Sequence, residues 1–344
     1  METTPRPAGL PRGFFAPVPL AADERPRLFI IVDTEEEFDW SAPFSREAVG
    51  VTAIDAVDGL HRTVGPYGLR PTYVIDYPVA ATPSSARRLK TLADAGDCEI
   101  GAHLHPWVNP PYDEPLGPRT SYACNLGADL EAEKLTRLAG AIAENLGLTP
   151  RVYKAGRYGF GTTTAATLER IGFDVDVSVN PHMDFTGDGG PDFRAFDERP
   201  GYFGGARRLL EVPCTTGFIG AVRRAGPALH PVASAAWLRP VRAVGILSRS
   251  GLLNRVMLSP EGSTLAEMQA LTRALHADGA RIFCLTFHSP SLKPGCTPYV
   301  RTASDLDAFL ATIDRYCDFF IHGLGGVPGT PAGWYDQLTR GDAT

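Results

Sequence analysis

Short apolar, β-branched runs recur along the chain and alternate with stretches of helical character. The runs lie at 28–32, 72–75, 98–103, 152–154, 174–179, 209–214, 281–287 and 318–321. The helical stretches lie near 53–65, 85–95, 129–146, 162–171, 264–279 and 304–316. Because such alternation builds parallel sheets covered by helices, the pattern predicts an α/β protein, either a parallel barrel or an open sheet.

Composition agrees with a protein that has a large core and excludes some function classes. The 344 residues are 44% hydrophobic and carry a net charge of −6. A negative chain is a poor general partner for nucleic acid, so we expect no nucleic-acid binding. No run of 18 apolar residues is present, so no membrane span is expected.

The cysteines and the N-terminus favour a cytoplasmic protein. Six scattered cysteines without a C-x-x-C pair are typical of reduced thiols. Residues 1–26 form a Pro-rich arm that lacks the basic and apolar regions of a signal peptide.

One segment, 212–260, has an unusual charge pattern. It contains six arginines but no Asp, Glu or Lys, and the rest of the chain carries −12 against its +6. Such an apolar, arginine-rich insertion could contact an anionic membrane peripherally or clamp a phosphate. The simpler alternative, which we favour, is a set of helices packed on the body with arginines paired to carboxylates.

Carboxylates and histidines follow two of the predicted strands. Asp33 and Glu35 end the first run on one face, and His103 and His105 have the same spacing at the end of another. Two histidines and one carboxylate make an open metal site that leaves a position for water. A solvated acidic turn and structural histidines are the alternatives, but α/β barrels place chemistry at these strand ends.

Three later positions carry further polar groups. Arg157 lies in a glycine-rich stretch, 156–161, that matches no nucleotide-binding pattern and could pair with a carboxylate. Asp176 shares one strand face with Asp174 and Ser178. His288 ends a buried strand, where it could be structural or serve as a general acid.

The ordered set of Asp, His-x-His, Arg, Asp and His at strand ends resembles the polysaccharide deacetylase (NodB-homology) family of carbohydrate esterases. Three stretches, 33–40, 103–107 and 259–262, look most like its WalW-type branch. The resemblance covers about 27–322. It implies a single-domain, distorted (β/α)7 barrel with an arginine-rich insertion at about 217–260 and a C-terminal tail at 323–344.

The resemblance also implies roles for individual residues. Asp33 matches the catalytic base, and Glu35 matches a metal ligand, with Glu36 as the alternative. His103 and His105 match the two metal histidines.

By the same resemblance, Arg157 matches the arginine that holds the carboxylate of the catalytic base. Asp176 matches the aspartate that tunes the catalytic histidine, and His288 matches that histidine. The chain departs from the family at Thr34-Glu35-Glu36, at the single residue between the histidines, and at Tyr158-Gly159 after the arginine. These departures bear on the carboxylate ligand and on metal geometry.

Five aromatic residues near these motifs could stack on sugar rings or simply pack in loops: Trp40, Trp107, Tyr112, Tyr158 and Tyr299. We therefore expect a cytoplasmic, metal-dependent hydrolase that deacetylates an N-acetylated sugar or glycoconjugate intermediate. Zinc is favoured by the two histidines, although Co, Ni or Mn also suit a mixed N/O site. The alternatives are the same hydrolase acting on a non-sugar amide or imide, and a catalytically silent glycan-binding barrel.

Overall fold

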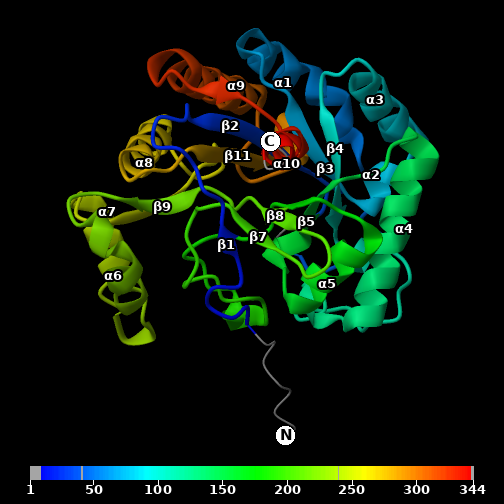
Figure 1. Ribbon diagram of the computed structural model, residues 1–344, viewed down its shortest axis with the longest axis horizontal. Helices are drawn as coiled ribbons and strands as arrows, with labels where there is room; N and C mark the ends of the chain where they lie inside the picture. The colour runs from blue at the N-terminus through cyan, green and yellow to red at the C-terminus, as the bar shows by residue number, and fades with distance from the viewer. Residues whose placement is uncertain (1–8, 40–41, 239, 342–344) are drawn as a thin grey trace, which may run out of the picture.

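The computed structural model describes residues 9–39, 42–238 and 240–341, which are built around one large sheet (Figure 1). Its strands are β1 (Ala16–Pro17), β2 (Arg27–Thr34), β3 (Pro71–Ile75), β4 (Glu99–Leu104), β5 (Val152–Ala155), β6 (Val175–Asp176), β7 (Gly201–Phe203), β8 (Leu209–Glu211), β11 (Ile282–His288) and β12 (Val327–Pro328). The order is β1-β7-β8-β6-β5-β4-β3-β2-β11, with β12 also beside β2. The run from β8 to β11 is parallel throughout, as strand–helix alternation predicts.

Helices surround the parallel strands (Figure 1). They are α1 (Val57–Val64), α2 (Tyr77–Ala81), α3 (Pro83–Asp94), α4 (Ala128–Leu146), α5 (Thr162–Ile171), α6 (Gly226–Ala233), α7 (Ala243–Arg249), α8 (Leu265–Ala277), α9 (Ala303–Asp318) and α10 (Pro331–Gly341). The strand predicted at 318–321 was wrong, because Phe319–Gly323 continues α9 as a π-helical turn. Its buried Phe320 extends the helical spacing of Ile313 and Tyr316 rather than a two-residue alternation.

The two faces of the sheet contact different cores. Leu28, Ile30 and Val32 of β2 belong to a large cluster that includes the surrounding helices. Phe29 and Ile31 belong to a second cluster formed by alternate residues of the other strands. We call the face that carries this second cluster the inner face, since side chains of β2, β5 and β11 meet there around one small hollow.

The expected distorted (β/α)7 barrel is not confirmed, because no ladder joins β11 to β8 within the described residues. Instead, two backbone amides of β11 donate hydrogen bonds to loop residues. The Cys284 amide donates to Thr215 Oγ1 at 2.8 Å, and the Thr286 amide donates to the Leu258 carbonyl at 3.1 Å. The fold is therefore a mixed α/β domain built on a parallel sheet.

Both predicted terminal segments contact this body. In the arm, β1 pairs with β7, and Phe15 packs edge-on against Phe203. In the tail, α10 places Trp334 against Phe29, with ring centroids 6.0 Å apart, in the inner cluster. Figure 1 shows α10 at the centre of the ring of strands, so the tail covers one end of the inner face.

The arginine-rich insertion forms a separate hairpin-like unit. It begins with β9 (Thr216–Ile219), passes through α6 and α7, and returns through β10 (Asn254–Met257), which is antiparallel to β9. Figure 1 shows α6 and α7 at the edge of the molecule, away from the main strands. Among the described residues, no helix combines the length and apolar character needed to cross a bilayer.

We predict that Trp334→Ala lowers the free energy of unfolding by about 3–5 kcal/mol, because it removes a fully packed aromatic side chain. Trp237→Ala is the matched control, since Trp237 is 72% exposed and should change stability by less than about 0.5 kcal/mol. Urea unfolding measures both. Equal effects would contradict the packing of α10 described above.

Glu131 gives stability a pH dependence. It is buried in α4 and accepts a hydrogen bond from Thr164 of α5, and burial raises its pKa to about 7. Between the unfolded pKa and this value the folded protein binds more protons than the unfolded chain, so its contribution to stability falls as pH rises. Glu131→Gln should remove that fall, on the order of 3 kcal/mol between pH ~4.5 and ~8. An unchanged slope in unfolding experiments across this range would contradict the prediction.

Candidate active site

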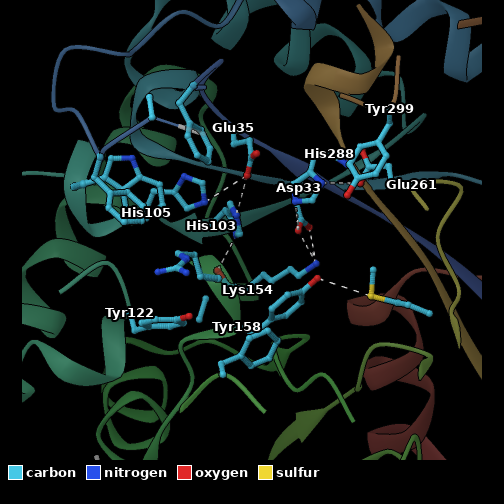
Figure 2. A pocket seen from close by; sticks show the side chains of 18 residues that line it. Asp33, Glu35, His103, His105, Tyr122, Lys154, Tyr158, Glu261, His288 and Tyr299 are labelled. Atoms are coloured by element: carbon cyan, nitrogen blue, oxygen red, sulfur yellow. Dashed lines mark hydrogen bonds and ion pairs between the residues drawn. The ribbon is translucent and has the colours of Figure 1, made fainter. Parts of the chain in front are cut away.

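Polar side chains from the ends of four parallel strands meet in one cavity of about 390 Å³ (Figure 2). Strand register brings them together. His288 of β11 lies opposite Asp33 of β2, and His103 of β4 lies opposite Lys154 of β5. All four continue the alternation of the inner face, so they project to the same side of the sheet.

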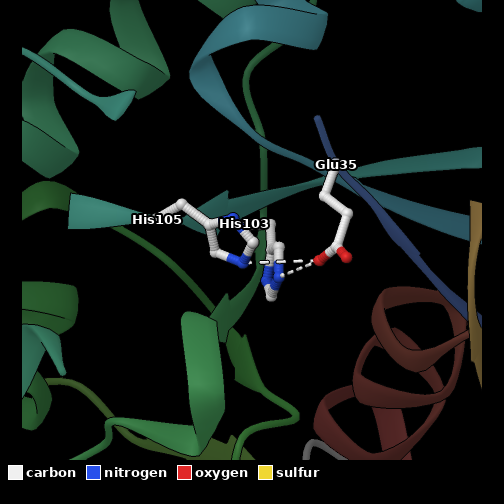
Figure 3. A group of neighbouring side chains, drawn as sticks. All are labelled: Glu35, His103 and His105. Carbon is white, nitrogen blue, oxygen red and sulfur yellow. Dashed lines mark ion pairs between the residues drawn. The ribbon is translucent and has the colours of Figure 1, made fainter. Parts of the chain in front are cut away.

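Glu35, His103 and His105 form a compact group of possible metal ligands (Figure 3). Glu35 Oε2 lies 3.5 Å from His103 Nε2 and 3.4 Å from His105 Nε2. All three side chains are buried, and Glu35 Oε1 has no hydrogen-bond partner among the described residues. A buried carboxylate that has one oxygen beside two imidazole nitrogens and the other oxygen without a partner suits a divalent cation.

The hydrogen bonds of the two rings leave both Nε2 atoms free to bind a metal. His103 Nδ1 donates to the Lys154 carbonyl at 3.0 Å, and His105 Nδ1 lies 2.8 Å from Glu36 Oε2. Because a carbonyl only accepts, the proton of His103 sits on Nδ1. Burial lowers the pKa of His103 and lowers that of His105 to about 4, so both rings are neutral ligands near pH 7.

Glu36 supports His105 from behind. It accepts from Trp107 Nε1 at 2.8 Å, and Trp107 stacks on the His105 ring with centroids 4.2 Å apart. Burial raises the pKa of Glu36 to about 8, and burial together with Glu36 raises that of Asp76 well above its usual value. The structure thus places Glu35 at the two Nε2 atoms and Glu36 at the far nitrogen of one ring.

A glycine makes room for this ring. A Cβ on Gly156 would lie 2.4 Å from His105 Cδ2 and 2.6 Å from the Leu104 carbonyl. The glycine after β5 therefore lets the backbone pass directly against the imidazole, which explains one glycine of the 156–161 stretch.

Asp33 is held by Lys154, a residue that sequence analysis did not single out. Lys154 Nζ lies 2.6 and 2.7 Å from the two oxygens of Asp33 and 3.1 Å from Thr286 Oγ1. Burial, the largest influence, would raise the pKa of Asp33, but Lys154, His103 and His288 together outweigh it and the pKa is lowered. The same pairing raises the pKa of Lys154 despite its burial, so a full ion pair lies at the floor of the cavity.

Arg157, which we expected to hold Asp33, has other partners. Its guanidinium donates to Ser121 Oγ at 2.6 Å and to Asp188, and lies 4.3 Å from the centre of the Tyr122 ring. Arg157 follows β5 in a tight turn, with φ of +54°. The strand itself ends before it, so the inner-face cation nearest Asp33 is Lys154. The signal for it was the alternation of β5, in which Val152 and Lys154 share the inner face.

His288 is oriented by Glu261 rather than by Asp176. His288 Nδ1 lies 2.7 Å from Glu261 Oε2, and the His288 amide donates to Glu261 Oε1 at 3.1 Å. Although burial opposes the charged ring, the carboxylates of Glu261 and Glu35 raise the pKa of His288 to about 10. Its Nε2 lies 3.8 Å from Asp33 Oδ2, so the two groups face each other across the cavity.

Asp176 lies on the opposite face of the sheet. Its carboxylate accepts from the Ser178 hydroxyl at 2.6 Å and the Ser178 amide at 3.1 Å. Its neighbours Val175 and Val177 belong to the inner cluster, so alternation turns Asp176 away from His288. Glu261 stands at the end of the arginine-rich segment, in the Ser259–Gly262 stretch, which resemblance marked without assigning it a role.

The aromatic candidates fall into three groups. Trp107, Tyr158 and Tyr299 line the cavity, where Tyr158 stacks on Phe185. Tyr112 does not line it and instead lies beneath Arg46. Trp40 lies outside the described residues. Phe38, Phe44 and Tyr122 add aromatic lining that sequence analysis did not predict.

Comparison with known proteins shows a shared fold. No sequence profile of a known family and no curated protein matches the chain. A protein of Mycobacterium smegmatis assigned as a polysaccharide deacetylase superposes with a TM-score of 0.53 and 17% identity, over 95% of this chain and 94% of that one. The allantoinase PuuE superposes with a TM-score of 0.52 and 13% identity, over 92% and 90%. The expected deacetylase-type fold is thus supported, while the WalW-type branch has no such support.

We predict that Lys154→Met destabilises the protein by about 3–5 kcal/mol, because it leaves the buried Asp33 carboxylate unpaired. Combining it with Asp33→Asn should recover part of that loss. Arg157→Met is the control and should cost within about 1 kcal/mol, since its ion pair is partly exposed. Urea unfolding of the four proteins decides the matter: a larger loss for Arg157→Met would reverse the assignment.

Proposed function

We propose that this protein is a metal-dependent hydrolase that removes an N-acyl group, typically acetyl, from an amino sugar or glycoconjugate intermediate. The observation that carries the proposal is the division of one cavity into two halves. Glu35, His103 and His105 present three ligand atoms on one side, and Asp33 and His288 face each other beside them. The aromatic walls of the cavity support a sugar, whose ring faces stack on such side chains.

We assign the metal to the Glu35, His103 and His105 group. A divalent metal ion there supplies Lewis-acid activation of water and of the amide carbonyl. Two neutral imidazoles and one carboxylate favour zinc, and Co, Ni or Mn also suit these ligands. Glu36 acts as a positioning residue that fixes the His105 ring.

We assign proton transfer to the other half of the cavity. Asp33, kept ionised by Lys154, takes the proton of the attacking water. His288, kept charged by Glu261, donates a proton from Nε2 to the leaving amine. Lys154 and Glu261 therefore take over the orienting roles that resemblance implied for Arg157 and Asp176.

We further propose that the protein belongs to the polysaccharide deacetylase family, in its WalW-type branch, and acts in the cytoplasm. The motif wording at 33–40, 103–107 and 259–262 supports the branch. Six free cysteines support a reducing compartment.

A second candidate is the same hydrolase acting on a non-sugar amide or cyclic imide. The fold likeness to an allantoinase favours it, since that protein is named for a non-sugar substrate. A panel of N-acetylhexosamine conjugates and cyclic ureides separates the two candidates, because only the correct class should release product.

Metal analysis with amine-release assays tests the main proposal. We expect about one zinc per chain in wild type, lost together with activity in His103→Ala and His105→Ala. Asp33→Asn and His288→Ala should keep the metal and lose about 10²–10⁴-fold in kcat. His322→Ala, at the surface, is the control. Wild-type protein that stays metal-free after zinc is supplied would overturn the proposal.

A further inference from the structure

The segment between β9 and β10, residues 220–253, exposes an unusual amount of apolar surface. We call it the arginine arm. Seven of the eleven exposed large hydrophobic side chains in the described part of the chain belong to it: Val222, Leu229, Val232, Trp237, Val241, Ile246 and Leu252. Scattered single exposures are normal, but such a concentration marks an interaction surface.

The helices of the arm are scarcely packed on the body. The seven residues of α7, Ala-Val-Gly-Ile-Leu-Ser-Arg, include none that is buried, and α6 buries only Gly226 and Ala233. A surface helix normally buries its apolar stripe against a core. Large apolar side chains of the two helices, namely Leu229, Val232 and Ile246, thus stay exposed in the described molecule.

The charge around this apolar surface has one sign. Across 212–260 there are six arginines and no Asp, Glu or Lys. Arg223 and Arg224 form ion pairs with Asp278, which follows α8 directly, and these pairs anchor the start of the arm. Arg242 directly precedes α7, and Arg249 is the last residue of α7. Both are exposed and form no ion pair with any described residue.

We propose that the arginine arm docks the protein on an anionic lipid surface. Exposed Trp and aliphatic side chains beside unpaired arginines match the interface of such a membrane, where apolar groups enter the acyl boundary and cations meet headgroups. A symmetric second copy fits less well, because it would bring two positive surfaces together without acidic groups to pair them. The remainder of the chain, at −12, would be repelled by the same membrane and so keep the arm as its point of contact.

Docking there would bring the catalytic cavity near the lipid. The arm returns through β10, whose last residue, Met257, lines the cavity. Leu252 and Met257 are separated by about 17 Å of extended chain at most. This inference goes beyond the proposed reaction and does not depend on it, since lipid binding is measured without substrate or metal.

Flotation with vesicles tests the proposal. Wild-type protein should float with phosphatidylcholine vesicles that contain phosphatidylglycerol at low salt, and less so at high salt. Replacing Arg242 and Arg249 by Gln should weaken binding by about fivefold each. Trp237→Ala should weaken it roughly tenfold. Leu116→Ser, at an exposed apolar position outside the arm, is the control and should bind as wild type does.

A second readout follows Trp237 directly. Its fluorescence should shift to the blue when anionic vesicles are added, and the shift should vanish in Trp237→Ala. Absence of flotation, binding that the arm variants do not change, or equal binding to pure phosphatidylcholine would overturn the proposal. A concentration-dependent dimer that shifts the same fluorescence without lipid would also overturn it, in favour of a second copy as the occupant.

Discussion

The ion pair between Lys154 and Asp33 is the interaction around which the site is organised. Both groups are buried, and a buried charge is tolerated only where its partner is held close. Parallel strand pairing meets that condition, since β5 and β2 both direct alternate residues to the inner face. The rigid sheet therefore supplies an ionised carboxylate at the cavity floor, and the ligand group and His288 are arranged around it.

The histidines on the two sides of the cavity differ in their protonation state. Burial keeps His103 and His105 neutral, because the desolvation of a charged ring outweighs the attraction of the nearby carboxylates. His288 lies in the same cavity, yet Glu261 raises its pKa and keeps its ring charged. Histidines of the same chemistry thus differ in charge through their neighbours alone, and the proposed division into a metal side and an acid side needs such a difference.

The arginine arm makes the distribution of charge over the molecule uneven. Its positive, apolar surface lies at the edge of an otherwise acidic body, and β10 connects it to the cavity wall (Figure 1). The segment that leaves the regular strand–helix alternation also leads into Ser259–Gly262, which delivers Glu261 to His288. The insertion thus forms a surface feature and ends directly before Glu261, the residue that contacts the proposed general acid.

The sequence by itself determined the α/β class, the strand ends that carry Asp33, Glu35, His103, His105 and His288, and the outlying character of 212–260. These follow from local periodicity and composition, which are properties of the chain alone. Only the tertiary structure decided that Lys154 contacts Asp33 and that Glu261 contacts His288. It also decided that Asp176 lies on the opposite face of the sheet and that Glu35 rather than Glu36 meets both Nε2 atoms. In the described part of the chain it joins β11 to β2 but not to β8. Those outcomes depend on which strands become neighbours and on which face each residue takes, and distant segments of the chain settle both through packing.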